Sequence, residues 1–139
     1  MLKLRKVWKD RGISISTKVR LIRALVFSVV TYGCESWTLK KKARAKISSF
    51  EYWCWRRLLG ISWKDRRTNE SITKELGVEP QLVFQIDKQK LSFVGHVCRA
   101  NGLEKTIMLG MGEGKRKRGK PRMRWIDGVR ELMDLTSKC

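Results

Sequence analysis

The sequence predicts a small all-α protein, a bundle of about four to five helices. Three long segments repeat apolar residues at the spacing of an amphipathic helix, and glycine follows the first two of them. Hydrophobic residues make up 42% of the 139 positions, which is enough to bury a core. The chain is therefore expected to form one domain, or one domain with an appendage.

The first long helix is predicted to begin after Ser16, a residue type that caps helix N-termini, and to end at Gly33. Apolar side chains cover most of its circumference, and Arg20, Arg23 and Phe27 form one narrow stripe with a polar edge. A helix that is apolar nearly all round is usually buried. We therefore expect this helix to be largely buried in the core.

The second long helix is predicted to start at Thr38 and to close at Gly60. Its apolar residues recur at steps of three and four, which gives a coiled-coil-like stripe. The opposite side is expected to form a basic outer face. The apolar stripe comprises Leu39, Ala43, Ile47, Phe50, Cys54 and Leu58, and the outer side comprises Lys41, Arg44, Ser48, Glu51 and Trp55.

The middle of the chain is predicted to hold a short helix and a third long helix. The short helix, Asn69–Leu76, follows a capping Thr68 and stops at Gly77. Pro80 opens the long helix at a first-turn position that tolerates proline. The apolar face of the long helix comprises Leu82, Ile86, Phe93 and Val97, and its polar stripe comprises Gln85, Gln89, Ser92, His96 and Arg99.

The C-terminal part is predicted to be a loop followed by a last helix. Residues Gly102–Gly119 are rich in glycine and charge and show no helical period, which indicates a basic Gly-rich loop. The segment Pro121–Leu135 is amphipathic and is expected to bury Ile126, Val129 and Met133.

The net charge of +19 is the most informative feature of the composition. Residues 1–60 carry 15 basic against three acidic residues, residues 61–114 carry eight against seven, and residues 115–139 carry nine against three. Such a charge opposes compaction unless an acidic partner neutralises it. Nucleic acid is the expected partner, because its phosphates are densely spaced and release counterions on binding. A membrane surface is the weaker alternative.

The cysteines and the N-terminal residues indicate an intracellular protein, in the nucleus or the cytoplasm. The four cysteines form no CxxC pair, and the sequence shows no secretory signal. The apolar run Ala24–Cys34 is too short to span a bilayer. Nucleic acid is the expected partner of the basic surface, so no membrane partner is expected. Residues 1–34 hold only one acid, as in a mitochondrial transit peptide, but a core helix explains the apolar run better.

Few residues suit catalysis or metal binding. His96 is the single histidine, and it is expected to face solvent or a partner rather than to act in catalysis. His96 and Cys98 are two positions apart, but Cys34 and Cys54 are distant, whereas four-ligand zinc sites usually contain tight pairs. No cluster of acids suits two magnesium ions. We expect no catalytic residue, no metal and no cofactor.

Several tryptophans lie next to cations, the pattern by which proteins stack on bases while holding phosphate. The alternative is that Trp53, Trp63 and Trp125 fill the core while their basic neighbours reach outward, and this explains most of them better. Trp55 alone is expected to be partly exposed. The neighbouring cations are Arg56, Arg57, Lys64, Arg66, Arg67, Arg122 and Arg124.

A helix-turn-helix is an alternative interpretation of the stretch ITKELGVEPQLVFQI, in which Gly77 lies in the turn. It predicts sequence-specific binding of duplex DNA through Gln81 and Gln85. However, Glu79 and Pro80 open the second helix, and the segment is nearly neutral, so it would not attract phosphate. A simple helical hairpin explains the pattern better.

Four stretches occur in order along nearly the whole chain: ISISTKVRLIRALVFSVVTYGCESWTL, FEYWCWRRLLGISWKDRRTNESI, KLSFVGHVCRAN and KRGKPRMRWIDGV. Their most specific motifs are YGCESW, RRLLGISW, RRTNE, GKPRMRWIDG and the F-x-GH-x-x-R pattern that starts at Phe93. Together they resemble the C-terminal region, thumb and tail, of the reverse transcriptases of RTE-type non-LTR retrotransposons, which are LINE-like elements. The resemblance implies that the first helices form a polymerase thumb, which grips a template–primer duplex.

The resemblance also implies which parts are missing. The fingers, the palm with its catalytic aspartates and the N-terminal endonuclease of such elements have no counterpart here, so we expect no enzyme. Elements of this type are often truncated at the 5′ side, so a functionless relic of a truncated element is an alternative. Another is a polymerase completed by a palm supplied by a longer protein or in trans.

We therefore expect a non-catalytic fragment that binds the phosphate backbone of RNA, of an RNA–DNA hybrid or of a duplex. Residues 1–60 would form the thumb-like segment, residues 61–101 a helical hairpin, and residues 102–139 the basic loop and last helix. The run Lys115–Lys120 would suit a nuclear signal, although such clusters are common and unspecific. A purely disordered tail is disfavoured because an amphipathic helix follows directly, so the preferred interpretation is a basic loop that clamps phosphates and is anchored by the helix of Trp125. The expected contacts are Lys40, Lys41, Lys42, Arg44, Trp55, Arg56, Arg57, Lys64, Arg66, Arg67, His96 and Arg99, together with Lys115, Arg116, Lys117, Arg118, Lys120, Arg122 and Arg124.

Overall fold

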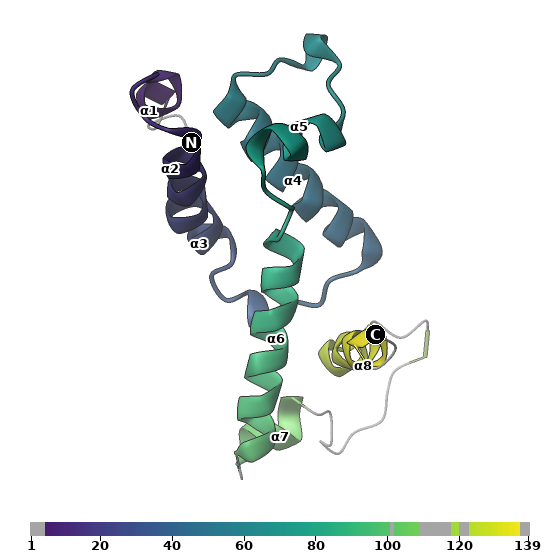
Figure 1. The fold of residues 1–139 in the computed structure, drawn as a ribbon. Helices are drawn as coiled ribbons and strands as arrows, with labels where there is room; N and C mark the ends of the chain where they lie inside the picture. The colour runs from purple at the N-terminus through teal and green to yellow at the C-terminus, as the bar shows by residue number, and fades with distance from the viewer. Residues whose placement is uncertain (1–4, 101, 109–117, 120–122, 137–139) are drawn as a thin grey trace. The chain divides into compact units, whose positions relative to one another are not determined.

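The computed structural model describes residues 5–100, 102–108, 118–119 and 123–136, and these residues form helices and no strand (Figure 1). Five of the described helices have seven residues or more, so the predicted all-α class is confirmed. The chain divides into two compact units, one of Met1–Tyr32 with Lys41–Val83 and one of Gly33–Lys40 with Phe84–Cys139. The division into three segments by composition stays a prediction.

The first unit begins with α1, Arg5–Lys9, and a longer helical stretch. This stretch consists of α2, Ile15–Leu21, a π-helical segment, Ile22–Phe27, and α3, Ser28–Val30. Ser14 caps it, because the Ser14 hydroxyl accepts a hydrogen bond from the Thr17 amide at 3.2 Å. The prediction of Ser16 as the cap is wrong, since the helix has already begun at Ile15.

This helical stretch buries one face rather than its whole circumference. Ile22 and Phe27 are buried, and the Phe27 ring meets the Trp55 ring edge-on with centroids 5.5 Å apart. Leu25 and Val29 are 50% and 74% exposed, so the prediction of a largely buried helix is wrong. The expected polar-edged stripe also fails, because Phe27 is the residue that points into the core.

The helix α4, Lys41–Leu59, is the longest of the first unit and contacts α1. It begins three residues later than predicted and ends as predicted at Gly60, which has a φ of 71°. Cys54 and Leu58 are buried as expected, but Glu51 and Trp55, predicted on the outer side, are also buried. The helix is therefore turned about its axis, relative to the predicted stripe, toward Glu51 and Trp55.

Glu51 explains this rotation, because its carboxylate caps the start of α6, Leu82–Arg99. Its Oε1 and Oε2 atoms accept hydrogen bonds from the backbone amides of Gln81 and Leu82, each at 2.9 Å. The first amides of a helix have no acceptor within the helix, and a negative charge is favoured at this end. The cost of burying the Glu51 carboxylate is thus offset by hydrogen bonds from two amides that would otherwise have no acceptor.

The short helix α5, Asn69–Leu76, has the predicted bounds and contacts α4. The Thr68 hydroxyl accepts a hydrogen bond from the Ser71 amide at 3.3 Å, and Gly77 ends the helix with a φ of 61°. The sequence predicted both ends of α5, because an N-cap and a left-handed glycine each depend only on residues within a few positions along the chain.

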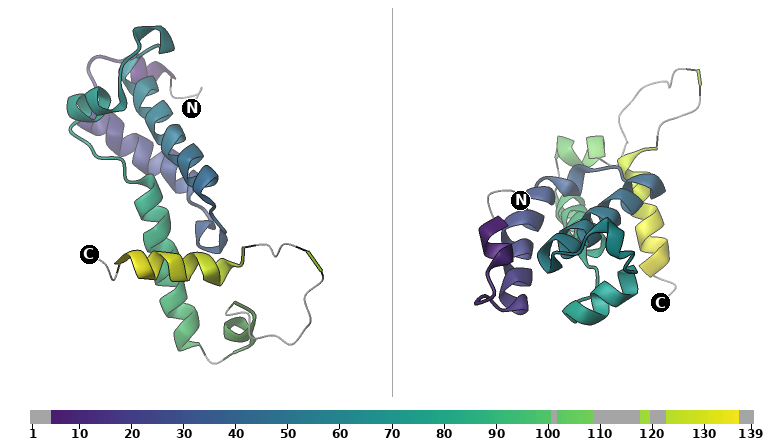
Figure 2. Two further views of the ribbon diagram at one scale, coloured as in Figure 1. Left: turned by 90° about the vertical axis from the view of Figure 1, so that its right-hand side faces the viewer. Right: turned by 90° about the horizontal axis from the view of Figure 1, so that it is seen from above.

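The second unit contains α6 from Phe84 onward, the short helix α7, Leu103–Met108, and α8, Trp125–Thr136. Figure 2 shows α8 lying across α6. The predicted loop Gly102–Gly119 therefore contains a helix, and its residues 109–117 lie outside the described residues. Ile126 and Val129 are buried as predicted, but Met133 is 55% exposed and Leu132 takes the buried position instead.

Lys90 is a buried charged residue of this unit and is only 4% exposed. Its ammonium donates to the backbone oxygen of Trp37 at 2.9 Å and lies 5.5 Å from the centroid of the Trp125 ring. A Cβ atom on Gly128 would come within 3.2 Å of the same ammonium, so α8 approaches α6 closely at a glycine. The Trp125 indole donates in turn to the backbone oxygen of Glu35 at 2.7 Å.

Within the described ranges, no helix combines the length and the apolar character needed to cross a membrane.

Replacing Glu51 by Ala should lower the free energy of unfolding by about 2–4 kcal/mol, because two amides at the start of α6 would lose their acceptor. Urea denaturation followed by far-UV circular dichroism measures this loss. Glu75→Ala is the matched control, since it removes an exposed carboxylate paired with Arg67 and should cost less than about 1 kcal/mol. Equal effects of the two substitutions would contradict the capping role.

Candidate nucleic-acid interface

The face of α4 opposite its buried side carries a row of exposed basic and aromatic side chains. Lys42, Lys46, Trp53 and Arg57 follow one another at intervals of four, seven and four residues, which places them on one side of a helix. All four are exposed, and Trp53 is 45% exposed. We call these four residues the α4 stripe. The prediction that Trp53 fills the core is wrong.

Aromatic contacts order the C-terminal half of the α4 stripe. The rings of Phe50 and Trp53 stack at an interplanar angle of 22°, with centroids 6.0 Å apart. The guanidinium carbon of Arg57 lies 5.6 Å from the centroid of the Trp53 ring. Cation–π contact of this kind holds an exposed arginine in place while its donors stay available to a phosphate.

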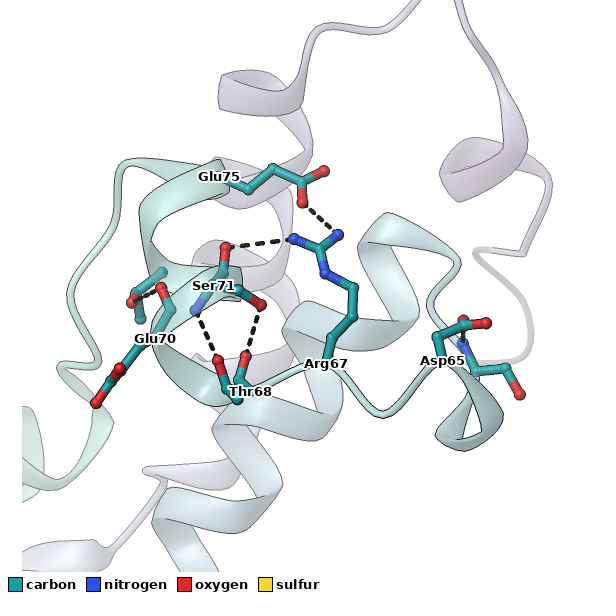
Figure 3. Close-up of polar contacts among 8 residues, drawn as sticks. Asp65, Arg67, Thr68, Glu70, Ser71 and Glu75 are labelled. Carbon is teal, nitrogen blue, oxygen red and sulfur yellow. Dashed lines mark hydrogen bonds and ion pairs between the residues drawn. The ribbon is translucent and has the colours of Figure 1, made fainter.

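Two predicted phosphate ligands are instead engaged within the first unit. Arg56 Nη2 donates to Asn69 Oδ1 at 2.6 Å and to the backbone oxygen of Arg67 at 3.3 Å. Arg67 forms an ion pair of 2.6 Å with Glu75 and donates to the backbone oxygen of Ser71 (Figure 3). These two arginines hold α5 and its preceding loop to α4, so their first role is structural.

Trp55 is excluded as a nucleic-acid contact by its burial. It is fully buried, so the prediction that it is partly exposed is wrong and its ring is not available to a base. Arg44 is half-buried. The burial of Trp55 and the exposure of Trp53 follow from the same rotation of α4.

The other predicted cations of this region are exposed. Lys41 precedes the α4 stripe, Lys64 and Arg66 lie in the loop after α4, and Lys40 belongs to the second unit. Lys46 was not predicted as a contact. Its spacing of four residues from Lys42 was the signal that would have found it, once the outer face of the helix was correctly placed.

The polar stripe of α6 lines a shallow hollow in the second unit. Its volume is about 450 Å³. His96 is exposed, as expected, and lines the hollow together with Arg99, but the acidic residue Glu35 lines it as well. The hollow is therefore less favourable to phosphate than the α4 stripe. Its lining residues are Glu35, Gln89, Ser92, Phe93, His96 and Arg99.

Only part of the predicted C-terminal basic cluster lies within the described residues. Arg118 is exposed. Arg124 directly precedes α8 and is held by Asp127, since its amide donates to Asp127 Oδ2 at 3.0 Å and its guanidinium pairs with Oδ1 at 3.3 Å. The hydrogen bond from that amide is the main reason why the pKa of Asp127 is lowered. Lys115, Arg116, Lys117, Lys120 and Arg122 lie outside the described residues.

The cysteines of the described residues behave as core side chains or lie apart from one another. Burial, and next the charge of Glu51, raises the pKa of Cys54 to about 12. Burial, and next the charge of Glu35, raises the pKa of Cys34, whose thiol donates to Gln89 Oε1 at 2.8 Å. Cys98 is exposed. In the part of the chain that the structure describes, no three His, Cys, Asp or Glu side chains gather as metal ligands would.

The start of α6 disfavours the helix-turn-helix alternative. A recognition helix presents its N-terminal end to DNA, where free amides and the helix dipole favour phosphate. Here the carboxylate of Glu51 occupies the amides of Gln81 and Leu82. A negative charge at this end would repel the DNA backbone.

Comparison with known proteins links the chain to transposable elements. No protein-family model and no solved structure matches it. A curated relative from Caenorhabditis elegans, named as an uncharacterized transposon-derived protein, is 30% identical over an alignment of 120 positions, and the match takes in 82% of this chain. The matched region covers 43% of the length of that relative. The similarity fits a transposable-element origin.

We expect Cys98 to react quickly with a thiol reagent in the folded protein, and Cys34 and Cys54 to react slowly. The two buried thiols have raised pKa values and stay protonated at pH 8, whereas the thiolate is the reactive form. Labelling with a chromogenic disulfide should be done in a Cys139→Ser chain, in which one fast thiol is expected. All three thiols should react rapidly in urea, and three fast thiols without urea would contradict the burial.

Proposed function

We propose that this chain is a nucleic-acid-binding part of a transposable-element protein, and that its α4 stripe holds the phosphate backbone of a template–primer duplex. The observation that carries the proposal is the exposed row of Lys42, Lys46, Trp53 and Arg57 on one face of a 19-residue helix. The proposal assigns binding to the chain and no catalytic step. It places this binding in the nucleus or the cytoplasm.

The dimensions of the α4 stripe suit a nucleic-acid backbone. Lys42 and Arg57 are 15 positions apart, which corresponds to about 22 Å along a helix. Phosphates of one strand repeat about every 3.4 Å of helix axis, so the stripe can reach several of them. Lysine ammonium groups bind phosphate as point charges, whereas the guanidinium of Arg57 can form paired hydrogen bonds.

The chemistry of the stripe favours binding that does not depend on base sequence. Three cations and one aromatic ring supply charge and apolar contact, which act on phosphates and ring faces of any sequence. The stripe contains no Asn, Gln or acidic side chain of the kind that reads adenine or cytosine. The charge of +19 strengthens attraction to any polyanion. A template–primer duplex is copied regardless of sequence, so this kind of contact is what a polymerase thumb requires.

Two further observations support the finer assignment to a reverse-transcriptase thumb. Arg57, the last residue of the α4 stripe, belongs to RRLLGISW. This is one of the motifs through which the sequence resembles reverse transcriptases of RTE-type non-LTR retrotransposons. The relative from Caenorhabditis elegans is named as transposon-derived. We propose an RNA–DNA hybrid as the preferred ligand, because that is the duplex such a thumb holds during copying.

A chain with Lys42→Gln, Lys46→Gln and Arg57→Gln should bind a blunt RNA–DNA hybrid at least tenfold more weakly at moderate salt. Each lost phosphate contact lowers the slope of log K against log salt by about 0.9. Fluorescence anisotropy with a labelled hybrid, measured over a salt series, gives both the affinity and the slope. Duplex DNA and single-stranded RNA of the same length test the preference for the hybrid.

The control variant carries Lys74→Gln, Lys88→Gln and Arg130→Gln, three exposed positions on α5, α6 and α8. It loses the same net charge without touching the α4 stripe. A site-specific interface predicts a much smaller loss of affinity for the control than for the stripe variant. Equal losses would show that overall charge, rather than this face of α4, accounts for binding, and would contradict the proposal.

A further inference from the structure

Trp63 presents a large aromatic ring to solvent just beyond the end of α4. Its side chain is 84% exposed. It was expected to fill the core, so this prediction is wrong. A tryptophan buries much apolar area when it finds a partner, and tryptophans kept at the surface are enriched in binding sites.

The backbone around Trp63 is fixed by a capping box. Trp63–Asp65 forms a 3₁₀ turn, in which the Ser62 amide donates to Asp65 Oδ2 at 2.6 Å. The Ser62 hydroxyl accepts from the Lys64 amide at 3.4 Å, and the Asp65 amide donates to the Ser62 oxygen at 3.1 Å. The ring therefore extends from an ordered turn, and little backbone entropy is lost when a ligand binds it.

Arg56 holds both ends of the loop that carries this turn. Its backbone oxygen accepts from the Ile61 amide at 2.9 Å, directly after Gly60. Its guanidinium reaches the backbone oxygen of Arg67 and the side chain of Asn69 at the other end. Figure 3 shows how Arg67 is fixed in turn by Glu75 and Ser71. The loop is thus anchored to the same helix that carries the α4 stripe.

The free charges beside the ring are positive. Lys64 and Arg66 are exposed, and the carboxylate of Asp65 is directed to the Ser62 amide. Arg66 adopts a left-handed backbone with a φ of 45°, which ends the 3₁₀ turn. An exposed aromatic ring with cations close by in the same turn is the arrangement used to stack on a base while its phosphates are neutralised.

We propose that Trp63 stacks on an unpaired nucleobase, at the point where the strand leaves the duplex held by the α4 stripe. This inference rests on the proposed function and adds a second ligand group, the base of a single-stranded nucleotide. Stacking on a base requires no particular sequence, because every base has an aromatic face. The alternative is that the Trp63 ring inserts into a pocket of a partner protein. The nearby cations Lys64 and Arg66 favour nucleic acid over this alternative.

The test compares a blunt RNA–DNA hybrid with the same hybrid carrying a short unpaired extension. Trp63→Ala should weaken binding of the extended hybrid about tenfold and change binding of the blunt hybrid less than twofold. Trp63→Phe should keep most of the affinity, because a smaller aromatic ring still stacks. A third probe replaces the bases of the extension with abasic sites, which keeps the phosphates. The wild-type chain should bind the abasic extension about tenfold more weakly than the intact one. The Trp63→Ala chain should bind the two extensions with equal affinity.

Photo-crosslinking locates the contact directly. An iodinated uracil in the extension should crosslink to the tryptic peptide Leu58–Lys64, in which Trp63 is the one aromatic residue. Phe84→Ala is the matched control, since Phe84 is a 70% exposed aromatic residue on α6 and its loss should change neither affinity nor crosslinking. Far-UV circular dichroism should show the same helix content in all variants, because Trp63 is exposed.

Unchanged affinity of Trp63→Ala for the extended hybrid, or equal weakening on the blunt and extended hybrids, would overturn the inference. So would equal affinity of the wild-type chain for the abasic and intact extensions. If the blunt hybrid still binds through Lys42, Lys46 and Arg57 in those cases, the proposed function stands without the stacking contact. Absence of binding to the blunt hybrid would instead overturn the proposed function.

Discussion

The first unit depends on one buried interaction, the capping of α6 by the carboxylate of Glu51. The cost of burying this carboxylate is offset by its hydrogen bonds from the amides of Gln81 and Leu82. These bonds require Glu51 to point inward from α4. Trp55 and Leu58, on the same side of the helix, are then buried as well. The opposite side, with the α4 stripe, must face solvent. The same contact that stabilises the fold therefore decides which cations are presented.

The cations of this chain fall into two classes with different physical roles. Lys18 and Lys90 are buried, and their ammonium groups donate to backbone oxygens, Lys18 to those of Trp8 and Asp10 and Lys90 to that of Trp37. Such lysines satisfy carbonyl groups in the interior and contribute little to a binding surface. Arg56 and Arg67 likewise fasten a loop. A total charge of +19 thus overstates the charge available to a partner, and the exposed face of α4 matters more than the sum.

The proposed interface combines two contacts of different chemistry on one scaffold. Charge along α4 acts on phosphates and weakens with salt, whereas stacking on Trp63 acts on a base and is much less sensitive to salt. Arg56 links them, because it belongs to α4 and anchors the loop that carries Trp63. A duplex with an unpaired strand offers both ligands next to each other, which is the form of nucleic acid present when a template is being copied.

The sequence by itself determined the helical class, the end of α4 at Gly60 and the full extent of α5 with its Thr68 cap and Gly77 stop. These features depend on residues within one or two turns of each other, so local patterns are sufficient. Only the tertiary structure decided which face of α4 is buried, and with it the exchange of roles between Trp55 and Trp53. That choice depends on Gln81 and Leu82, which lie 30 and 31 positions beyond Glu51. The exposure of Trp63 could not be predicted from the sequence either. An aromatic residue next to a lysine is compatible with a core or a surface position until its neighbours in space are known.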